Sequence, residues 1–154
     1  MYKAVDDGVD MIQLEVFSNK KERLNYFIDS VEKYIAVTKH RSVGYLLELK
    51  AESTPAAISD MVLTLISEKQ IEANVVIGSF DPVILKYVHQ KNSFLNTALM
   101  SKADSKSSFR KQMNDLGFNP TIYYAERSLV NDALIKDCKS RKIKLITWDQ
   151  SARP

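Results

Sequence analysis

Apolar and polar residues alternate along residues 11–16, which read Met-Ile-Gln-Leu-Glu-Val. Alternation of this kind predicts a β-strand, because successive side chains of a strand point to opposite faces. Gln13 and Glu15 therefore share one face, and the apolar residues share the other. A strand that faces water on its polar side would give the same pattern.

Residues 45–50, Tyr-Leu-Leu-Glu-Leu-Lys, repeat the pattern and predict a second strand. Leu46, Glu48 and Lys50 point one way, opposite the remaining leucines. If the sheet is covered on both faces, this polar side faces a sheet interior or a barrel lumen. Carboxylates near the strand ends then become candidates for chemistry.

Helical periodicity separates these strands from further apolar segments. Proline and hydroxyl or carboxylate residues mark helix starts at Ser53-Thr54-Pro55 and at Asp81-Pro82. We expect helices over residues 2–7 (closed by Gly8), 20–40, from 55, from 82 with Val83 inside, from 109 to Gly117 and over 127–141, and strands over 10–16, 44–50, 74–79, 93–100, 120–125 and 142–148.

Six strands that alternate with helices predict an α/β fold with a parallel sheet. The periodicity alone leaves an open doubly wound sheet and a barrel as alternatives. The chain has four glycines and no glycine-rich phosphate loop, which favours a (β/α) barrel-like fold. We expect a single domain over residues 1–154. Six strands leave apolar edges, so we expect a homodimer or a distorted, partly open barrel.

Composition is that of a globular protein, with 45% hydrophobic and 27% charged residues. The net charge of +3 is mild, and we interpret the basic cluster from Lys136 to Lys144 as a solvated helix face. Nucleic acid is therefore not an expected partner. The single cysteine, Cys138, excludes an internal disulfide and is expected in the core. No apolar run approaches the roughly 18 residues of a membrane span, and without a secretory signal we expect a cytoplasmic protein.

Four segments resemble one known family, in the right order. Residues 8–16 are similar to the G-A-D-x-I-E-x-D-V strand of glycerophosphodiester phosphodiesterases, which are TIM barrels. Residues 46–50 (Leu-Leu-Glu-Leu-Lys) resemble the I-E-I-K strand of the family. Residues 76–81 contain its S-F-D segment, and residues 143–148 resemble its closing W-T-V-N strand. The resemblance implies an incomplete, TIM-barrel-derived fold.

The resemblance also implies roles for individual residues. In the family, carboxylates of the first two motifs bind a divalent cation, usually calcium or magnesium, and oxygen ligands suit these ions. Gln13, Glu15 and Glu48 occupy those positions, and Gln13 replaces a carboxylate by a neutral amide. Lys50 matches the family lysine, and we assign it to the phosphate as the catalytic candidate. The substrate-binding residues are then Lys50 with two aromatic residues, Phe80 and Trp148.

The chain departs from the family at its two histidine motifs. Neither the H-R-G nor the H-D motif occurs, and His40 and His89 both lie near the predicted ends of helices, where they complement the helix dipole. The implied function is metal-dependent hydrolysis of a glycerophosphodiester, a small substrate of lipid metabolism, to an alcohol and glycerol 3-phosphate. The alternative is a catalytically inactive relative that acts as a binding or structural module.

Overall fold

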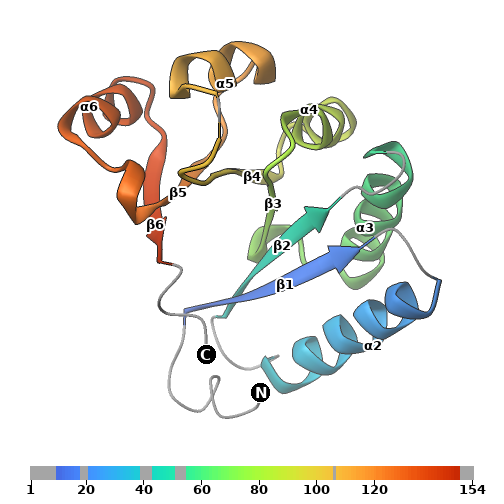
Figure 1. The fold of residues 1–154 in the computed structure, drawn as a ribbon. Helices are drawn as coiled ribbons and strands as arrows, with labels where there is room; N and C mark the ends of the chain where they lie inside the picture. Colours follow the sequence, from blue (N-terminus) through green and yellow to red (C-terminus); the bar gives the residue numbers. More distant parts are fainter. Residues whose placement is uncertain (1–9, 18–20, 39–42, 51–54, 106, 150–154) are drawn as a thin grey trace.

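The structure is a computed structural model that describes residues 10–17, 21–38, 43–50, 55–105 and 107–149. In this part of the chain, six parallel strands form one sheet whose strand order equals the chain order (Figure 1). The strands are β1 (Met11–Phe17), β2 (Gly44–Lys50), β3 (Val75–Ser79), β4 (Asn96–Ser101), β5 (Ile122–Glu126) and β6 (Lys144–Trp148).

Helices connect successive strands and lie together around the outside of the sheet (Figure 1). Within the described residues, none of them is both long and apolar enough to cross a membrane. The helices are α2 (Lys21–Thr38), α3 (Pro55–Lys69), α4 (Pro82–Lys91), α5 (Phe109–Leu116) and α6 (Asp132–Ser140), with short 3-10 turns η1 (Glu72–Asn74) and η2 (Arg127–Leu129).

The sheet is curled into a half-barrel. A sequential strand order contains no switch point, which a doubly wound sheet requires. β3 and β6 are three strand spacings apart, or about 14 Å along a flat sheet. Nevertheless, the rings of Phe80 and Trp148, at the ends of these two strands, meet edge to face with centroids 6.3 Å apart. The fold is therefore barrel-like and incomplete, as the sequence predicts.

Two apolar clusters lie on opposite faces of the sheet. The larger one joins the outer side chains of the strands to the helices and includes Leu47, Leu49 and Ile77, which are almost fully buried. The smaller one lies on the concave face and consists of strand residues alone: Leu46, Val76, Ala98 and Ile122, with Tyr124 and Ile146 packed against it. Alternation along each strand thus separates a helix-covered core from the half-barrel interior.

Local signals set several helix ends where the sequence predicts them. The Asp81 carboxylate accepts a hydrogen bond from the backbone N–H of Val83 at 2.8 Å and caps α4. Gly117 ends α5 in the left-handed conformation, with φ of 77°. Val83 itself is wrongly predicted as buried: its exposed fraction is 58%, because it lies in the first turn of α4 on the face away from the sheet.

Several predicted boundaries are wrong, and the two largest differences are at the starts of the helix expected from residue 127 and of the strand expected from residue 93. The helix expected over residues 127–141 begins with the turn η2, and α6 starts only after Asn131, whose side chain caps it by accepting from the Leu134 N–H at 2.9 Å. The strand expected from residue 93 starts at Asn96, because Asn92 accepts from the Phe94 N–H and forms a turn. The helix predicted over residues 2–7, with Gly8, and the hydroxyl cap at residues 53 and 54 lie outside the described residues.

Gly78 lets the concave face pack tightly. A Cβ atom at this position would lie 2.9 Å from Leu46 Cδ1 and 3.2 Å from the Met100 sulfur. A Cβ atom at Gly44, at the start of β2, would have no contact closer than 3.5 Å. The absence of a side chain at Gly78 therefore allows neighbouring strands to bring Leu46 and Met100 together.

We expect Gly78→Ala to lower the free energy of unfolding by about 1 kcal/mol, because Leu46 and Met100 must shift. Gly44→Ala is the matched control, since it adds a Cβ without a clash and is expected to change stability by no more than about +1 kcal/mol. Urea unfolding of both variants measures the difference. Equal stabilisation by the two substitutions would contradict the tight packing at Gly78.

Candidate functional site

A polar cluster lies on the concave side of β1 and β2, toward their carboxyl ends. Glu15 and Glu48 are direct neighbours in the parallel register of these strands, so their side chains share a face. Gln13 lies one row below Glu15, and Lys50 one row above Glu48. The structure thus brings together the four charged or amide residues that the sequence predicts as a site.

Glu48 is the centre of this cluster. Its exposed fraction is 1%, so both carboxylate oxygens depend on protein donors for hydrogen bonds. Gln13 donates from Nε2 to Glu48 Oε2 at 2.6 Å. The Lys50 ammonium lies 3.4 Å from Glu48 Oε1 and 2.8 Å from Glu15 Oε1. Lys50 and Glu15 are about one third exposed, with side-chain fractions of 33% and 38%, so the cluster opens to solvent on their side.

The polar cluster already holds a positive charge, the Lys50 ammonium, between the carboxylates of Glu15 and Glu48. Glu15 and Glu48 contribute two negative charges and Lys50 one positive charge, so the net charge is −1. Two carboxylates with the amide of Gln13 form an oxygen-rich donor set that suits a hard divalent cation. Among the described residues, no group of three or more His, Cys, Asp or Glu side chains gathers as a metal site, because Gln13 supplies an amide where the resemblance leads one to expect a carboxylate.

The two aromatic candidates lie at the same edge of the sheet. Phe80 follows β3 directly and Trp148 ends β6, so both are at carboxyl ends of strands. Their edge-to-face contact spans the mouth of the half-barrel, and Phe80 is 36% exposed. They form an apolar rim at the mouth, and its Phe80 end lies next to the charged cluster, because Phe80 comes two residues after Gly78, which pairs with Glu48 on the neighbouring strand.

The histidines do not join this cluster in the described part of the chain. His89 is on α4, where its ring stacks on Phe118 with centroids 3.9 Å apart. This contact fixes the imidazole in the outer layer, as the sequence predicts for a helix end. His40 lies outside the described residues.

Three further residues belong to the concave side and were missed by sequence reasoning. Tyr124 and Glu126 are on β5, and Lys144 begins β6. Glu126 accepts hydrogen bonds from the Ala103 N–H at 2.7 Å and from the Ser128 hydroxyl at 3.0 Å. Alternation along β5 and β6 is the signal that points to them, once the boundaries of these two strands are known.

Below the charged cluster, the concave face encloses a cavity of about 350 Å³. Gln13 lines it and so connects it to Glu48. Its volume and its mixture of apolar walls with a few polar groups are typical of a small-ligand pocket. The lining residues are Asp10, Met11, Gln13, Leu46, Ala98, Ile122, Tyr124, Lys144 and Ile146.

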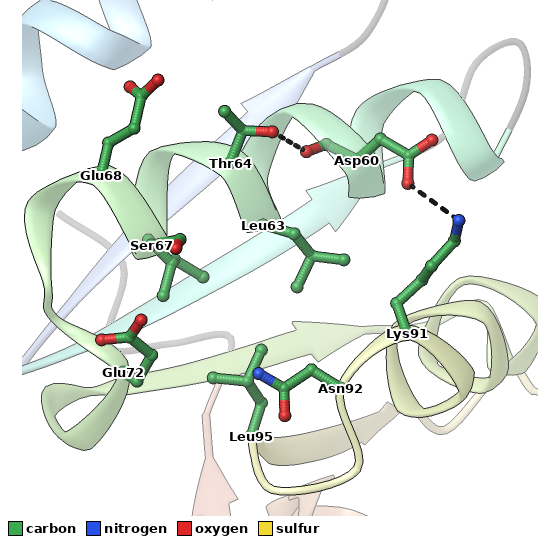
Figure 2. Close-up of a pocket in the computed structure, with 10 residues that line it drawn as sticks. Asp60, Leu63, Thr64, Ser67, Glu68, Glu72, Lys91, Asn92 and Leu95 are labelled. Atoms are coloured by element: carbon green, nitrogen blue, oxygen red, sulfur yellow. Dashed lines mark hydrogen bonds and ion pairs between the residues drawn. The ribbon is translucent and has the colours of Figure 1, made fainter.

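Two other cavities lie in the helical layer. Figure 2 shows the first, about 570 Å³ between α3 and α4, where Lys91 approaches Asp60 and where Glu68 and Glu72 add acidic groups. The second, about 420 Å³, is lined by residues of α5 and α6 and by Tyr123. Burial raises the pKa of the Tyr123 phenol, which donates to Gln112 at 2.7 Å.

The thiol of Cys138 is buried in the large core, as the sequence predicts. Burial raises the pKa of this thiol, and the nearby Asp137 carboxylate raises it further. A thiol with a raised pKa is a poor nucleophile at neutral pH. Cys138 therefore has a packing role.

Known structures share this fold. A phosphodiesterase from Oleispira antarctica, solved with its product sn-glycerol-3-phosphate, superposes with a TM-score of 0.73 at 11% identity, covering 96% of this chain and 75% of that protein. Glycerophosphodiester phosphodiesterases from Agrobacterium tumefaciens and Parabacteroides distasonis superpose with TM-scores of 0.64 and 0.62, at 13% and 17% identity, covering 95% and 77% of this chain and 76% and 50% of those proteins.

At such low identities, the likeness concerns the fold. No protein-family model matches the sequence, and no curated protein matches it. The chain spans 50% of the Parabacteroides protein and 44% of a further matched structure, from Silicibacter pomeroyi. The fold implied by the four sequence motifs is therefore confirmed, and the shared segment is about half of each of these two longer proteins.

We expect Lys50→Met to lower the free energy of unfolding by about 1–3 kcal/mol at pH 7, because the buried Glu48 carboxylate loses its cation. In a Glu48→Gln background the same substitution should cost less than about 1 kcal/mol, since a neutral amide needs no counter-charge. A double-mutant cycle by urea unfolding measures this difference.

Lys69→Met is the control for this cycle. Lys69 is also 33% exposed, but its partner Glu32 is 49% exposed. Loss of that surface pair should cost about 0–1 kcal/mol. A Lys50→Met cost that stays the same with and without Glu48 would contradict the buried pairing.

Proposed function

We propose that this chain is a phosphodiester hydrolase of the glycerophosphodiester phosphodiesterase type, which releases glycerol 3-phosphate. The observation that carries the proposal is the register-paired Glu15 and Glu48 with Lys50 between them. This cluster lies at the carboxyl ends of barrel-like strands, the edge at which such folds place their active sites. The shared fold and the family motifs support the same assignment.

Each residue has a defined task in this proposal. Glu15 and Glu48, with the amide oxygen of Gln13, would hold a calcium or magnesium ion. Such a cation, when bound, would offset the negative charge of the phosphodiester. Lys50 would contact a non-bridging phosphate oxygen as a point charge.

The aromatic rim serves the other end of the substrate. The rings of Phe80 and Trp148 contact each other at the carboxyl ends of β3 and β6, where they would contact the alcohol portion of a glycerophosphodiester. A cationic alcohol group such as choline would also gain from the ring faces, by about 0.5–1 kcal/mol at an exposed site.

A non-catalytic binding module is the second candidate, and one observation favours it. His89 stacks on Phe118 in the outer layer, so it supplies no acid or base to the cluster. A general acid or base typically contributes about 10²–10⁴-fold to the rate. A chain without such groups would keep phosphate binding and lose turnover.

Release of sn-glycerol 3-phosphate from glycerophosphocholine and related diesters tests the proposal. We expect turnover with calcium or magnesium and none with chelator. Glu48→Gln should reduce the rate by about 10²-fold, because it removes a carboxylate that would hold the cation, and the cation would stabilise the reacting phosphate. Lys69→Met removes one positive charge, as Lys50→Met does, but at the surface, and it should retain the wild-type rate.

The same assay decides between the two candidates. The proposal of hydrolysis is contradicted if the wild-type protein turns over no diester faster than Glu48→Gln does, with calcium or with magnesium. Binding of sn-glycerol 3-phosphate by that inactive wild-type protein, measured by calorimetry, would then establish the binding module.

A further inference from the structure

Lys50 has two incompatible tasks, if the proposed function holds. It is expected to contact a phosphate oxygen, yet in the structure its ammonium lies 2.8 Å from Glu15 and 3.4 Å from Glu48. An ammonium group paired with two carboxylates has few donors left for an anion. Phosphate binding therefore requires Lys50 to turn away from at least one of them.

Glu48 opposes that movement. Its carboxylate is 1% exposed, so water cannot replace a departing cation. Gln13 keeps one oxygen hydrogen-bonded at 2.6 Å, but a neutral amide does not compensate the charge. A buried carboxylate that loses its counter-ion is strongly destabilised, and so Lys50 is held in place as long as no other cation arrives.

The charge of the cluster opposes phosphate binding in the same state. Two carboxylates and one ammonium leave a net charge of −1. A phosphate ester that approaches within a few ångströms meets this negative charge in a partly buried environment, where repulsion is stronger than in water. The cluster as it stands repels the ligand that it is proposed to bind.

Lys50 is able to change partners. Its side chain is 33% exposed, and lysine carries its charge on a flexible stem with three rotatable donors. Its other partner, Glu15, is 38% exposed, so this half of the cluster borders solvent. Rotation of the stem would carry the ammonium from the carboxylates toward the mouth of the half-barrel.

We propose that Lys50 is a placeholder for a divalent cation and turns to the phosphate only when that cation replaces it between Glu15 and Glu48. The two carboxylates and the Lys50 ammonium carry a net charge of −1. A divalent cation between the carboxylates raises the net charge of the whole group, with Lys50 still counted, to +1. The ammonium that is released provides the phosphate contact. Cation binding and phosphate binding are therefore positively coupled through one side chain.

Calorimetric titration of the wild-type chain with calcium, in the presence and absence of sn-glycerol 3-phosphate, tests this coupling. We expect saturating sn-glycerol 3-phosphate to tighten calcium binding by at least about fivefold, and calcium to tighten sn-glycerol 3-phosphate binding by the same factor, because linkage is reciprocal. Inorganic phosphate serves as a second probe and tests whether the ester group is needed. Calcium affinity that is unchanged by either anion would overturn the proposal.

The Lys50→Met variant tests the placeholder role through its calcium affinity. A lysine that only bound phosphate could be removed without tightening calcium binding. Removal of the competing ammonium should tighten calcium binding by about fivefold or more, and should abolish the effect of sn-glycerol 3-phosphate on it. Lys69→Met, which removes an equal charge from the surface pair with Glu32, should bind calcium like the wild type. Equal or weaker calcium binding by a folded Lys50→Met variant contradicts the placeholder.

The outcomes separate this inference from the proposed function. If calcium and sn-glycerol 3-phosphate bind independently of each other and turnover is intact, the placeholder role of Lys50 is overturned and the proposed function stands. Absence of binding and turnover with every cation overturns both. The wild-type titrations decide the matter without any variant, so loss of folding in Lys50→Met leaves the test valid.

Discussion

The buried carboxylate of Glu48 is the constraint on which the site depends. It lies in the interior of the half-barrel at 1% exposure and needs both hydrogen-bond donors and a counter-charge. Gln13 meets these needs from the neighbouring strand and Lys50 from the same strand, and Glu15 shares the ammonium. A charge that is this costly to bury has a stronger functional than structural rationale, because an apolar residue at position 48 would carry no such cost.

The fold determines where this charge lies. Parallel strands in sequential order bring the carboxyl ends of all strands to one edge, and the curl brings β3 and β6 to each other across the mouth. The charged residues of β1 and β2 and the aromatic rim of Phe80 and Trp148 therefore lie at the same edge of the sheet. The concave apolar cluster and its cavity lie below, at the opposite end of the same strands.

Sequence alone predicts the α/β fold class, because alternating strands and helices follow from the hydrophobic pattern. Alternation also places Gln13 with Glu15, and Glu48 with Lys50, on shared strand faces, while the roles of these residues stay predictions. The spacing of Glu48 and Lys50 fixes their shared face, which the structure confirms. The pairing of Glu15 with Glu48 depends on the register of the two strands, which the spacing does not predict. The curl was supported by family motifs and not by periodicity, because curvature is set by packing between strands. Glu126 was missed because the predicted strand ended one residue before it. Lys144 lay inside the predicted strand and was missed because it was interpreted as part of a solvated basic helix face. The contact of Lys50 with both carboxylates depends on side-chain geometry. The spacing of residues along the sequence predicts only which face of the strand each side chain is on.

The central claim is that Glu15 and Glu48 form a cation site from which Lys50 moves to the phosphate. A crystal structure of the wild-type chain with calcium and sn-glycerol 3-phosphate tests it most directly. The account predicts calcium at about 2.3–2.6 Å from oxygens of both carboxylates, with the Lys50 ammonium hydrogen-bonded to a phosphate oxygen. Lys50 still between the two carboxylates, with phosphate bound elsewhere, would contradict it.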